Sequence, residues 1–125
     1  MRVRPQALRS VSDTALLVAY FRAMESQCPD ALFNDELAVK LSAARGEQIA
    51  RSLFYSRSSA WATIVRTVLI DDIVQRLVAT DVDSVINLGA GLDARPYRLP
   101  LPASLRWIEI DLPDLVREKN EALAA

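Results

Sequence analysis

The sequence contains no histidine and a single cysteine, Cys28, and these shortages exclude several kinds of site. Histidine is the commonest general base and the commonest metal ligand, so we expect no metal site and identify no catalytic residue. One cysteine cannot form an internal disulfide, which fits a reducing compartment. No apolar run approaches the roughly 20 residues of a membrane-spanning helix, and Arg22 closes the run at 15–21 too early for a secretory signal. We therefore expect a cytoplasmic protein that does not bind membranes.

The chain also lacks an excess of charge of either sign. Its 15 basic and 16 acidic side chains give a net charge of −1, which argues against nucleic acid as a partner. Apolar residues make up 51% of the 125 positions, enough for a folded core, and the length suits a single domain. The composition favours no particular oligomeric state.

The first 80 residues show helical periodicity. Apolar side chains recur every three or four positions, and proline disfavours a helical residue before it. Residues 47–57 carry no clear pattern. We expect helices at three places: from Ser12 as N-cap to a break at "QCPD" (27–30), from about Leu32 to Gly46, and over about 58–79.

From Asp81 the pattern changes to β-branched apolar residues followed by glycine, which is typical of a parallel strand leading into a loop. We expect one strand within "DVDSVINLGAG", a second over 105–111 ("LRWIEID"), and then a helix with Pro113 in its first turn. The sequence thus predicts an α/β protein, with a helical cap over 1–80 and the start of a sheet over 81–125. Two strands do not complete a parallel sheet, so we expect the chain to be part of a longer protein.

The stretch "VINLGAGLDARPYRL" raises the question of a ligand. Gly89, Gly91 and Ala94 fit the G-x-G-x-x-G/A pattern of dinucleotide-binding loops. Glycines allow backbone conformations that a Cβ forbids, and they let backbone amides turn toward a ligand. Asp111 follows at the end of the next strand, where its carboxylate can accept two hydrogen bonds from a ribose diol. A nicotinamide cofactor and S-adenosylmethionine both carry such a ribose.

Three prolines between the glycine turn and the second strand favour one of these ligands. Pro96, Pro100 and Pro102 leave room for at most a short helix within Leu92 to Leu99, because proline inside a helix costs about 3 kcal/mol. A pyrophosphate rests on the N-terminus of a full helix. We therefore favour S-adenosylmethionine, which has no phosphate. An NAD(P)-dependent oxidoreductase and a truncated, non-catalytic cofactor-binding fragment are the alternatives.

The same residues resemble a known family. "NLGAGLDARPYRL", "EIDLP" and Lys119 resemble the leucine carboxyl methyltransferase family, as do "SVSDTALLVAYFRAMES", "LFNDELA" and "VRTVLIDDIV". Its bacterial members are class I S-adenosylmethionine-dependent O-methyltransferases, many of them linked to polyketide pathways. The resemblance implies a Rossmann-like class I methyltransferase fold, here apparently truncated, and methyl transfer to a carboxylate or hydroxyl of a small molecule.

The resemblance also implies roles for particular residues. Gly89, Ala90 and Gly91 would line the methionine part of the cofactor, and Asp111 would hold the ribose hydroxyls. Arg66 matches the family arginine that pairs with the cofactor's carboxylate, and a guanidinium can bind a carboxylate through two hydrogen bonds. An N-terminal lysine of the eukaryotic members has no counterpart in "TALLVAY". This difference argues against a protein C-terminus as methyl acceptor.

Other polar and aromatic residues have a structural interpretation. Adjacent helical residues point about 100° apart, so Asp71 and Asp72 do not share a site, and we expect them to be solvated or paired locally. Two further groups are expected to be structural: Asp93, Arg95, Tyr97 and Arg98 as braces of the loop, and Trp61 and Trp107 as core residues.

Overall fold

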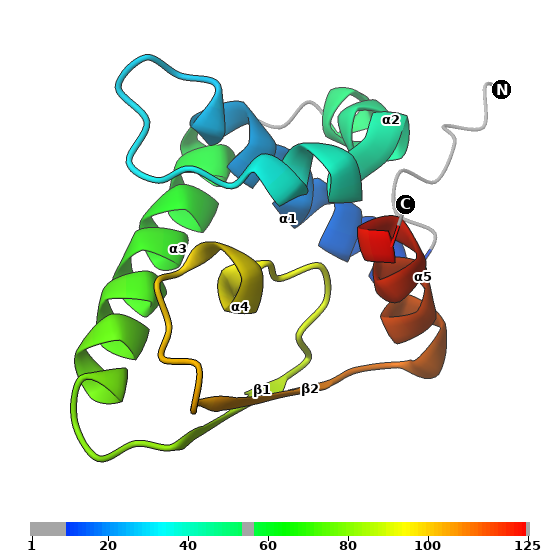
Figure 1. Ribbon diagram of the computed structural model, residues 1–125. Coiled ribbons are helices and arrows are strands. Elements are labelled where there is room, and N and C mark those ends of the chain that lie inside the picture. The colour runs from blue at the N-terminus through cyan, green and yellow to red at the C-terminus, as the bar shows by residue number, and fades with distance from the viewer. Residues whose placement is uncertain (1–9, 54–56, 125) are drawn as a thin grey trace, which may run out of the picture.

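The computed structural model describes residues 10–53 and 57–124, which form five helices and two strands (Figure 1). The elements are α1 (Val11–Ser26), α2 (Glu36–Ser52), α3 (Arg57–Val78), β1 (Ser84–Leu88), α4 (Arg95–Arg98), β2 (Arg106–Ile110) and α5 (Pro113–Ala124). Their order agrees with the sequence-based prediction, and the two strands pair in parallel. Within these described residues no helix combines the length and the apolar character needed to cross a bilayer.

The N-cap of the first helix lies two residues before the predicted one. Ser10 has an extended backbone and its side chain accepts a hydrogen bond from the Asp13 N–H at 3.3 Å, so Ser10 is the N-cap and Ser12 lies in the first turn. The helix ends at Ser26, directly before the "QCPD" stretch, as predicted. The error is small because both serines can cap a helix, and only the backbone conformation distinguishes them.

The second helix begins and ends later than predicted. Its N-cap is Asp35, whose carboxylate accepts a hydrogen bond from the Ala38 N–H at 2.9 Å. Gly46 does not end the helix, which continues to Ser52. A Cβ on Gly46 would lie 2.8 Å from the carbonyl oxygen of Leu16, so this glycine instead allows α1 and α2 to cross closely.

The two strands place their carboxyl ends at one edge of the sheet. The register pairs Ser84 with Arg106 at one end and Leu88 with Ile110 at the other. Side chains alternate between the two faces of a strand. One face is partly covered by the helices. We call the other face the open sheet face. Its four large apolar side chains are between 47% and 73% exposed: Ile86, Leu88, Ile108 and Ile110. Figure 1 shows no described helix beneath it.

The core lies between α1, α2, α5 and the loop after β1. One buried cluster consists of Ala19, Leu41, Leu92, Ala94 and Leu115. Leu92 and Ala94 belong to the loop that directly follows the glycine turn, so their burial fixes this loop against three helices. The core therefore also positions the candidate site.

The expectation that both tryptophans lie in the core is wrong for the described structure. Trp61 is 53% exposed, and Trp107 is only partly buried. Trp61 lies on the outer surface of α3, together with three other apolar residues that are each more than half exposed: Leu69, Ile73 and Leu77. The helical periodicity of α3 was read correctly, but it could not show which face would meet the core.

Candidate functional site

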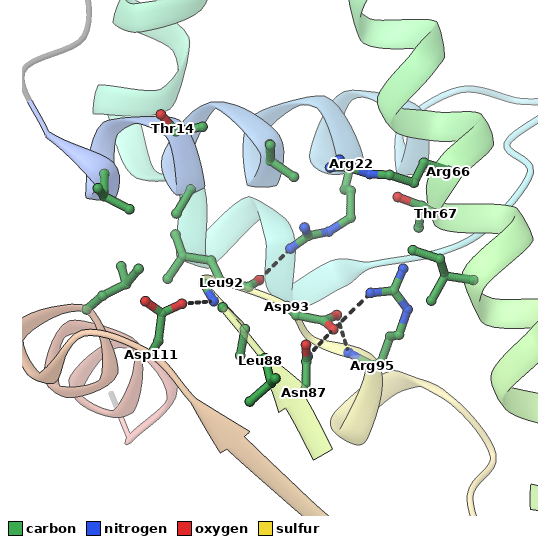
Figure 2. A pocket seen from close by; sticks show the side chains of 18 residues that line it. Thr14, Arg22, Arg66, Thr67, Asn87, Leu88, Leu92, Asp93, Arg95 and Asp111 are labelled. Carbon is green, nitrogen blue, oxygen red and sulfur yellow. Dashed lines mark hydrogen bonds and ion pairs between the residues drawn. The ribbon is translucent and has the colours of Figure 1, made fainter. Parts of the chain in front are cut away.

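A pocket of about 480 Å³ lies at the edge of the sheet where β1 and β2 end (Figure 2). Its walls come from α1, from α3 and from the loop after β1, and residues after β2 complete it. All five residues predicted to bind a cofactor line this pocket: Arg66, Gly89, Ala90, Gly91 and Asp111. The fold thus brings these five residues together from three separate stretches of the chain: α3, the glycine turn and the end of β2. Whether these residues bind a cofactor stays a prediction.

The glycine turn adopts backbone conformations that favour glycine. Gly89 has a φ of 66° and Gly91 a φ of 54°, both in the left-handed region. Apart from Gly89 and its two chain neighbours, no atom of the residues that the structure describes lies within 4 Å of the place where a Cβ on Gly89 would be, so the backbone conformation alone favours glycine there. A Cβ on Gly91 would lie 3.5 Å from the Ala15 Cβ. Helix α1 therefore lies directly over the turn.

The backbone amides of the turn already have partners, contrary to the expectation that they face a ligand. The Gly89 N–H donates to the Ile110 carbonyl oxygen at 2.8 Å, and the Gly91 N–H donates to the Asp111 carboxylate at 2.6 Å. The Ala90 N–H also donates to the Ile110 carbonyl, at 3.4 Å. These bonds hold the turn against the end of β2. The glycines can still let a ligand approach the backbone closely, because they carry no side chain.

Asp111 lies beside the turn with part of its carboxylate still available. One oxygen accepts from the Gly91 N–H at 2.6 Å, and the other accepts from the Leu112 N–H at 2.7 Å. A carboxylate offers about four acceptor positions, so each oxygen keeps capacity for a further donor. Two adjacent hydroxyl groups on a ribose are a suitable pair of donors. The position of Asp111 agrees with its predicted place at the end of the second strand.

Arg66 differs from the other arginines of the pocket. Arg22 and Arg95 also line it, but each is paired with an aspartate, at 2.8 Å and 2.7 Å respectively. The side chain of Arg66 is exposed and extends from α3 toward α1 (Figure 2). Across residues 10–53 and 57–124, Arg66 has no hydrogen bond or ion pair. Its guanidinium is therefore available to an anionic group of a ligand.

Asp93 and Arg95 brace the loop, as predicted. The Asp93 carboxylate accepts from the Asn87 side chain at 2.8 Å, from the Arg95 backbone N–H at 3.0 Å and from the Arg95 guanidinium at 2.8 Å. Figure 2 shows these bonds between residues that line the pocket. They tie the end of β1 to the start of α4.

Asp71 is buried, contrary to the expectation that it is solvated or paired locally. Its carboxylate accepts from Arg95 at 2.7 Å and from Arg98 at 2.8 Å, and the residue is only 6% exposed. Asp72 does pair locally, with Arg76 one turn later at 2.7 Å. The rotation of the helix places one aspartate inward and its neighbour outward. The two arginines in "DARPYRL" could have indicated a buried carboxylate from the sequence, because buried arginines need carboxylate partners.

Among the pocket residues that were not predicted from the sequence are three polar ones on α1 and α3: Arg22, Thr14 and Thr67. Thr67 is 4% exposed, and its hydroxyl donates to the Thr63 carbonyl oxygen at 2.9 Å. Helical periodicity alone does not reveal which polar residues of α1 and α3 face each other. No group of three or more acidic or cysteine side chains suited to a metal ion occurs among the residues that the structure describes.

The arrangement suits a nucleoside that carries a carboxylate better than a dinucleotide. Helix α4 has only four residues and begins after Ala94, so no full helix starts at the glycine turn to hold a pyrophosphate. Arg66 and Asp111 instead offer one partner for a carboxylate and one for a diol.

Comparisons with known proteins agree with this chemistry. The family model described as leucine carboxyl methyltransferase matches residues 15–125. A protein of Parafrankia sp. (strain EAN1pec) is 38% identical over 92% of this chain and 40% of its own length. Proteins of Streptomyces coelicolor and Mycolicibacterium paratuberculosis are each 37% identical, over 88% and 93% of this chain and 42% of their own lengths. All three bear the name "Putative S-adenosyl-L-methionine-dependent methyltransferase". The chain thus spans about two fifths of the length of these curated relatives.

Proposed function

The chain belongs to the leucine carboxyl methyltransferase family, and on that premise we propose that its pocket is the cofactor site of an S-adenosylmethionine-dependent O-methyltransferase. One observation carries this proposal. Asp111 and Arg66 lie on opposite sides of a single pocket, with the glycine turn also in its wall (Figure 2). The names of the relatives support the identity of the cofactor.

Each predicted residue has a separate task in the proposed site. Asp111 accepts hydrogen bonds from the two ribose hydroxyls, and Arg66 pairs with the carboxylate of the methionine part. Gly89, Ala90 and Gly91 line that methionine part, where small residues allow close approach. These contacts would recognise both ends of the cofactor's polar framework without any phosphate site.

The chain's contribution to catalysis is positioning and electrostatics. When bound, the cofactor would supply a methyl group on a positively charged sulfur: an acceptor oxygen would bond to the methyl carbon in line with the breaking carbon–sulfur bond, and the sulfur would leave as a neutral thioether. The residues of the pocket hold the cofactor in a fixed orientation for this attack. A carboxylate acceptor needs no general base, whereas a hydroxyl acceptor needs one. We propose a small-molecule acceptor of one of these two kinds and assign no base to this chain.

We further propose a Rossmann-like sheet, with residues 1–80 as its helical cap and residues 81–125 as its beginning. The pocket lies at the carboxyl edge of two parallel strands, which is where open α/β sheets bind ligands. Parallel sheets are covered on both faces, yet the open sheet face is apolar and exposed. We propose that polypeptide corresponding to the rest of the relatives covers this face. A cytoplasmic location is part of the same proposal.

The test is a calorimetric titration with S-adenosylhomocysteine, the product form of the cofactor, and with NADH. The variant Asp111→Ala removes the proposed ribose partner. Asp114→Ala is the matched control, because Asp114 is exposed and, among the described residues, pairs with Arg117 of the same helix alone, at 2.8 Å. Circular dichroism confirms that both variants fold.

We expect S-adenosylhomocysteine to bind the wild type and Asp114→Ala alike. Its affinity for Asp111→Ala should be at least about tenfold lower, which corresponds to a loss of at least about 1.4 kcal/mol. NADH binding tighter than that of S-adenosylhomocysteine would favour an oxidoreductase. If neither ligand binds the folded chain, the proposed cofactor site is wrong for this chain as it stands.

A further inference from the structure

Six charged side chains form a continuous series of ion pairs beside the pocket, and three of the six also line it. Each is at most 13% exposed, and the three positive and three negative charges balance. They are Arg22, Asp35, Arg98, Asp71, Arg95 and Asp93, in the order in which they touch. We call this series the charge ring.

The charge ring begins and ends on the loop after the glycine turn. At one end, the Arg22 guanidinium donates to the carbonyl oxygen of Leu92. At the other end, Asp93 accepts hydrogen bonds from the backbone and the side chain of Arg95, at 3.0 Å and 2.8 Å. Leu92 and Asp93 are consecutive residues, so the series closes on itself at the loop (Figure 2).

Asp71 is the point at which the charge ring holds α3. Its carboxylate lies 2.7 Å from both Arg95 and Arg98 of α4. The Arg98 guanidinium continues the series toward Asp35, at 3.5 Å. Helix α3 also carries Arg66, which reaches the pocket, whereas Asp71 itself does not line it. A bond at Asp71 therefore sets the position of Arg66 relative to the glycine turn without touching a ligand.

We propose that the charge ring is a positioning device for the pocket and that Asp71 is its central positioning residue. The ring holds α3 and the glycine loop in fixed positions before any ligand arrives. Buried ion pairs add little net stability compared with apolar packing, but their hydrogen bonds have defined directions. A site that is already ordered loses less conformational entropy when it binds. The identity of the ligand rests on the proposed function. The claim that the ring fixes the loop does not, because it depends only on contacts within this chain.

The test compares two identical substitutions at neighbouring residues. Asp71→Asn removes the central negative charge of the ring. Asp72→Asn removes a half-exposed charge that, within the described parts of the chain, pairs with Arg76 alone. Amide hydrogen exchange is measured by NMR on the full chain at Gly91, Asp93 and Arg95, with the core amides as reference. Arg95→Lys is a second variant, which keeps the charge but lacks the planar guanidinium that bonds both aspartates.

We expect Asp71→Asn and Arg95→Lys to speed exchange at the loop amides about tenfold or more relative to the core amides. Asp72→Asn should leave both sets unchanged. Uniform acceleration throughout the chain would show that the ring only stabilises the fold, and unchanged loop exchange would show that it does not hold the loop. Either result overturns the proposal. If Asp71→Asn does not fold, Arg95→Lys decides between these results.

A parallel titration with S-adenosylhomocysteine separates this inference from the proposed function. Asp71→Asn should bind the ligand at least about tenfold more weakly than Asp72→Asn, because the ligand must then order the loop itself. A loosened loop in a chain that binds no S-adenosylhomocysteine in any form would refute the cofactor assignment and uphold the positioning role. Equal affinities with a loosened loop would overturn the claim that the ring prepares the site for its ligand.

Discussion

At the scale of single residues, Gly46 shows how one missing side chain sets the packing of two helices. A Cβ there would lie 2.8 Å from the Leu16 carbonyl oxygen and 3.0 Å from the Tyr20 Cβ. Alanine in a helix is ordinarily favoured over glycine by up to about 1 kcal/mol, but overpacking costs about 1–3 kcal/mol. We therefore expect Gly46→Ala to lower the free energy of unfolding in urea. The exposed Gln48→Ala, two residues on, should change it by less than about 0.5 kcal/mol. A stabilised Gly46→Ala would contradict the close crossing of α1 and α2.

Tyr97 provides a second prediction at this scale, through its titration. Partial burial, and then the negative charge of Glu109, raise the pKa of Tyr97 above its ordinary value of 10.0. Lys119 lies 5.9 Å from the Tyr97 ring and is bonded to Glu109 at 2.7 Å. Because the folded state favours the neutral phenol, its contribution to stability is complete below pH 10 and is lost as pH rises through the raised pKa.

Absorbance of the phenolate measures this effect. The difference between the titration curves of the wild type and Tyr97→Phe should have a midpoint above pH 10. Tyr97→Phe should also reduce the loss of stability at alkaline pH. A difference curve with its midpoint at or below pH 10 would contradict the raised pKa of Tyr97.

The residues of the site divide into those that local sequence could predict and those that it could not. Gly89, Gly91 and Asp111 were predictable because strand ends and glycine turns are local features, and parallel strands bring their ends to one edge. The partners of Asp71 were not, because its arginines lie 24 and 27 residues further along the chain. Their meeting depends on how α3 packs against the loop, which periodicity does not specify.

At the scale of secondary-structure elements, two N-caps of different kinds allow a direct comparison. Ser10 caps α1 from an exposed position, whereas the fully buried Asp35 caps α2 and also pairs with Arg22 at 2.8 Å. We expect Ser10→Ala to cost about 1 kcal/mol of unfolding free energy. Asp35→Asn keeps a side-chain oxygen for the cap but removes the charge, so it should cost about 3–5 kcal/mol, because Arg22 then lacks its counter-ion. Thermal and urea unfolding measure both costs, and equal losses would contradict the ionic role of Asp35.

The elements themselves were predicted better than their boundaries. The prolines after the glycine turn correctly indicated a short helix, which the structure places at Arg95–Arg98. The end of α2 was missed, because Gly46 has the appearance of a helix stop but serves a helix crossing instead. A glycine can mark either feature, and only the neighbouring helix distinguishes them.

At the scale of the whole molecule, the open sheet face is the feature with the clearest consequence. Contiguous exposed apolar surface favours association with other polypeptides. We expect the chain to self-associate as its concentration rises and to bind a fluorescent apolar dye. The double variant Ile86→Lys, Ile108→Lys places two charges at paired positions on this face and should reduce both effects.

A matched control uses the same type of substitution elsewhere on the surface. Val39 lies on α2 and is 48% exposed, so Val39→Lys also replaces an exposed apolar residue with lysine. Sedimentation velocity should show this variant to associate like the wild type. A wild type that stays monomeric and binds no dye at any concentration would show that the open sheet face needs no covering partner.

The central claim, that one pocket of this chain holds S-adenosylmethionine between Arg66 and Asp111, is tested most directly by mapping where the ligand binds. NMR spectra of the isotope-labelled chain are recorded while S-adenosylhomocysteine is added. We predict shifts of the amide signals of Gly89–Gly91, of Asp111 and of the α3 turn that carries Arg66, with the signals of α2 unchanged. Saturating ligand that shifts no signal of the pocket, or shifts only signals outside it, would contradict the assignment of this site.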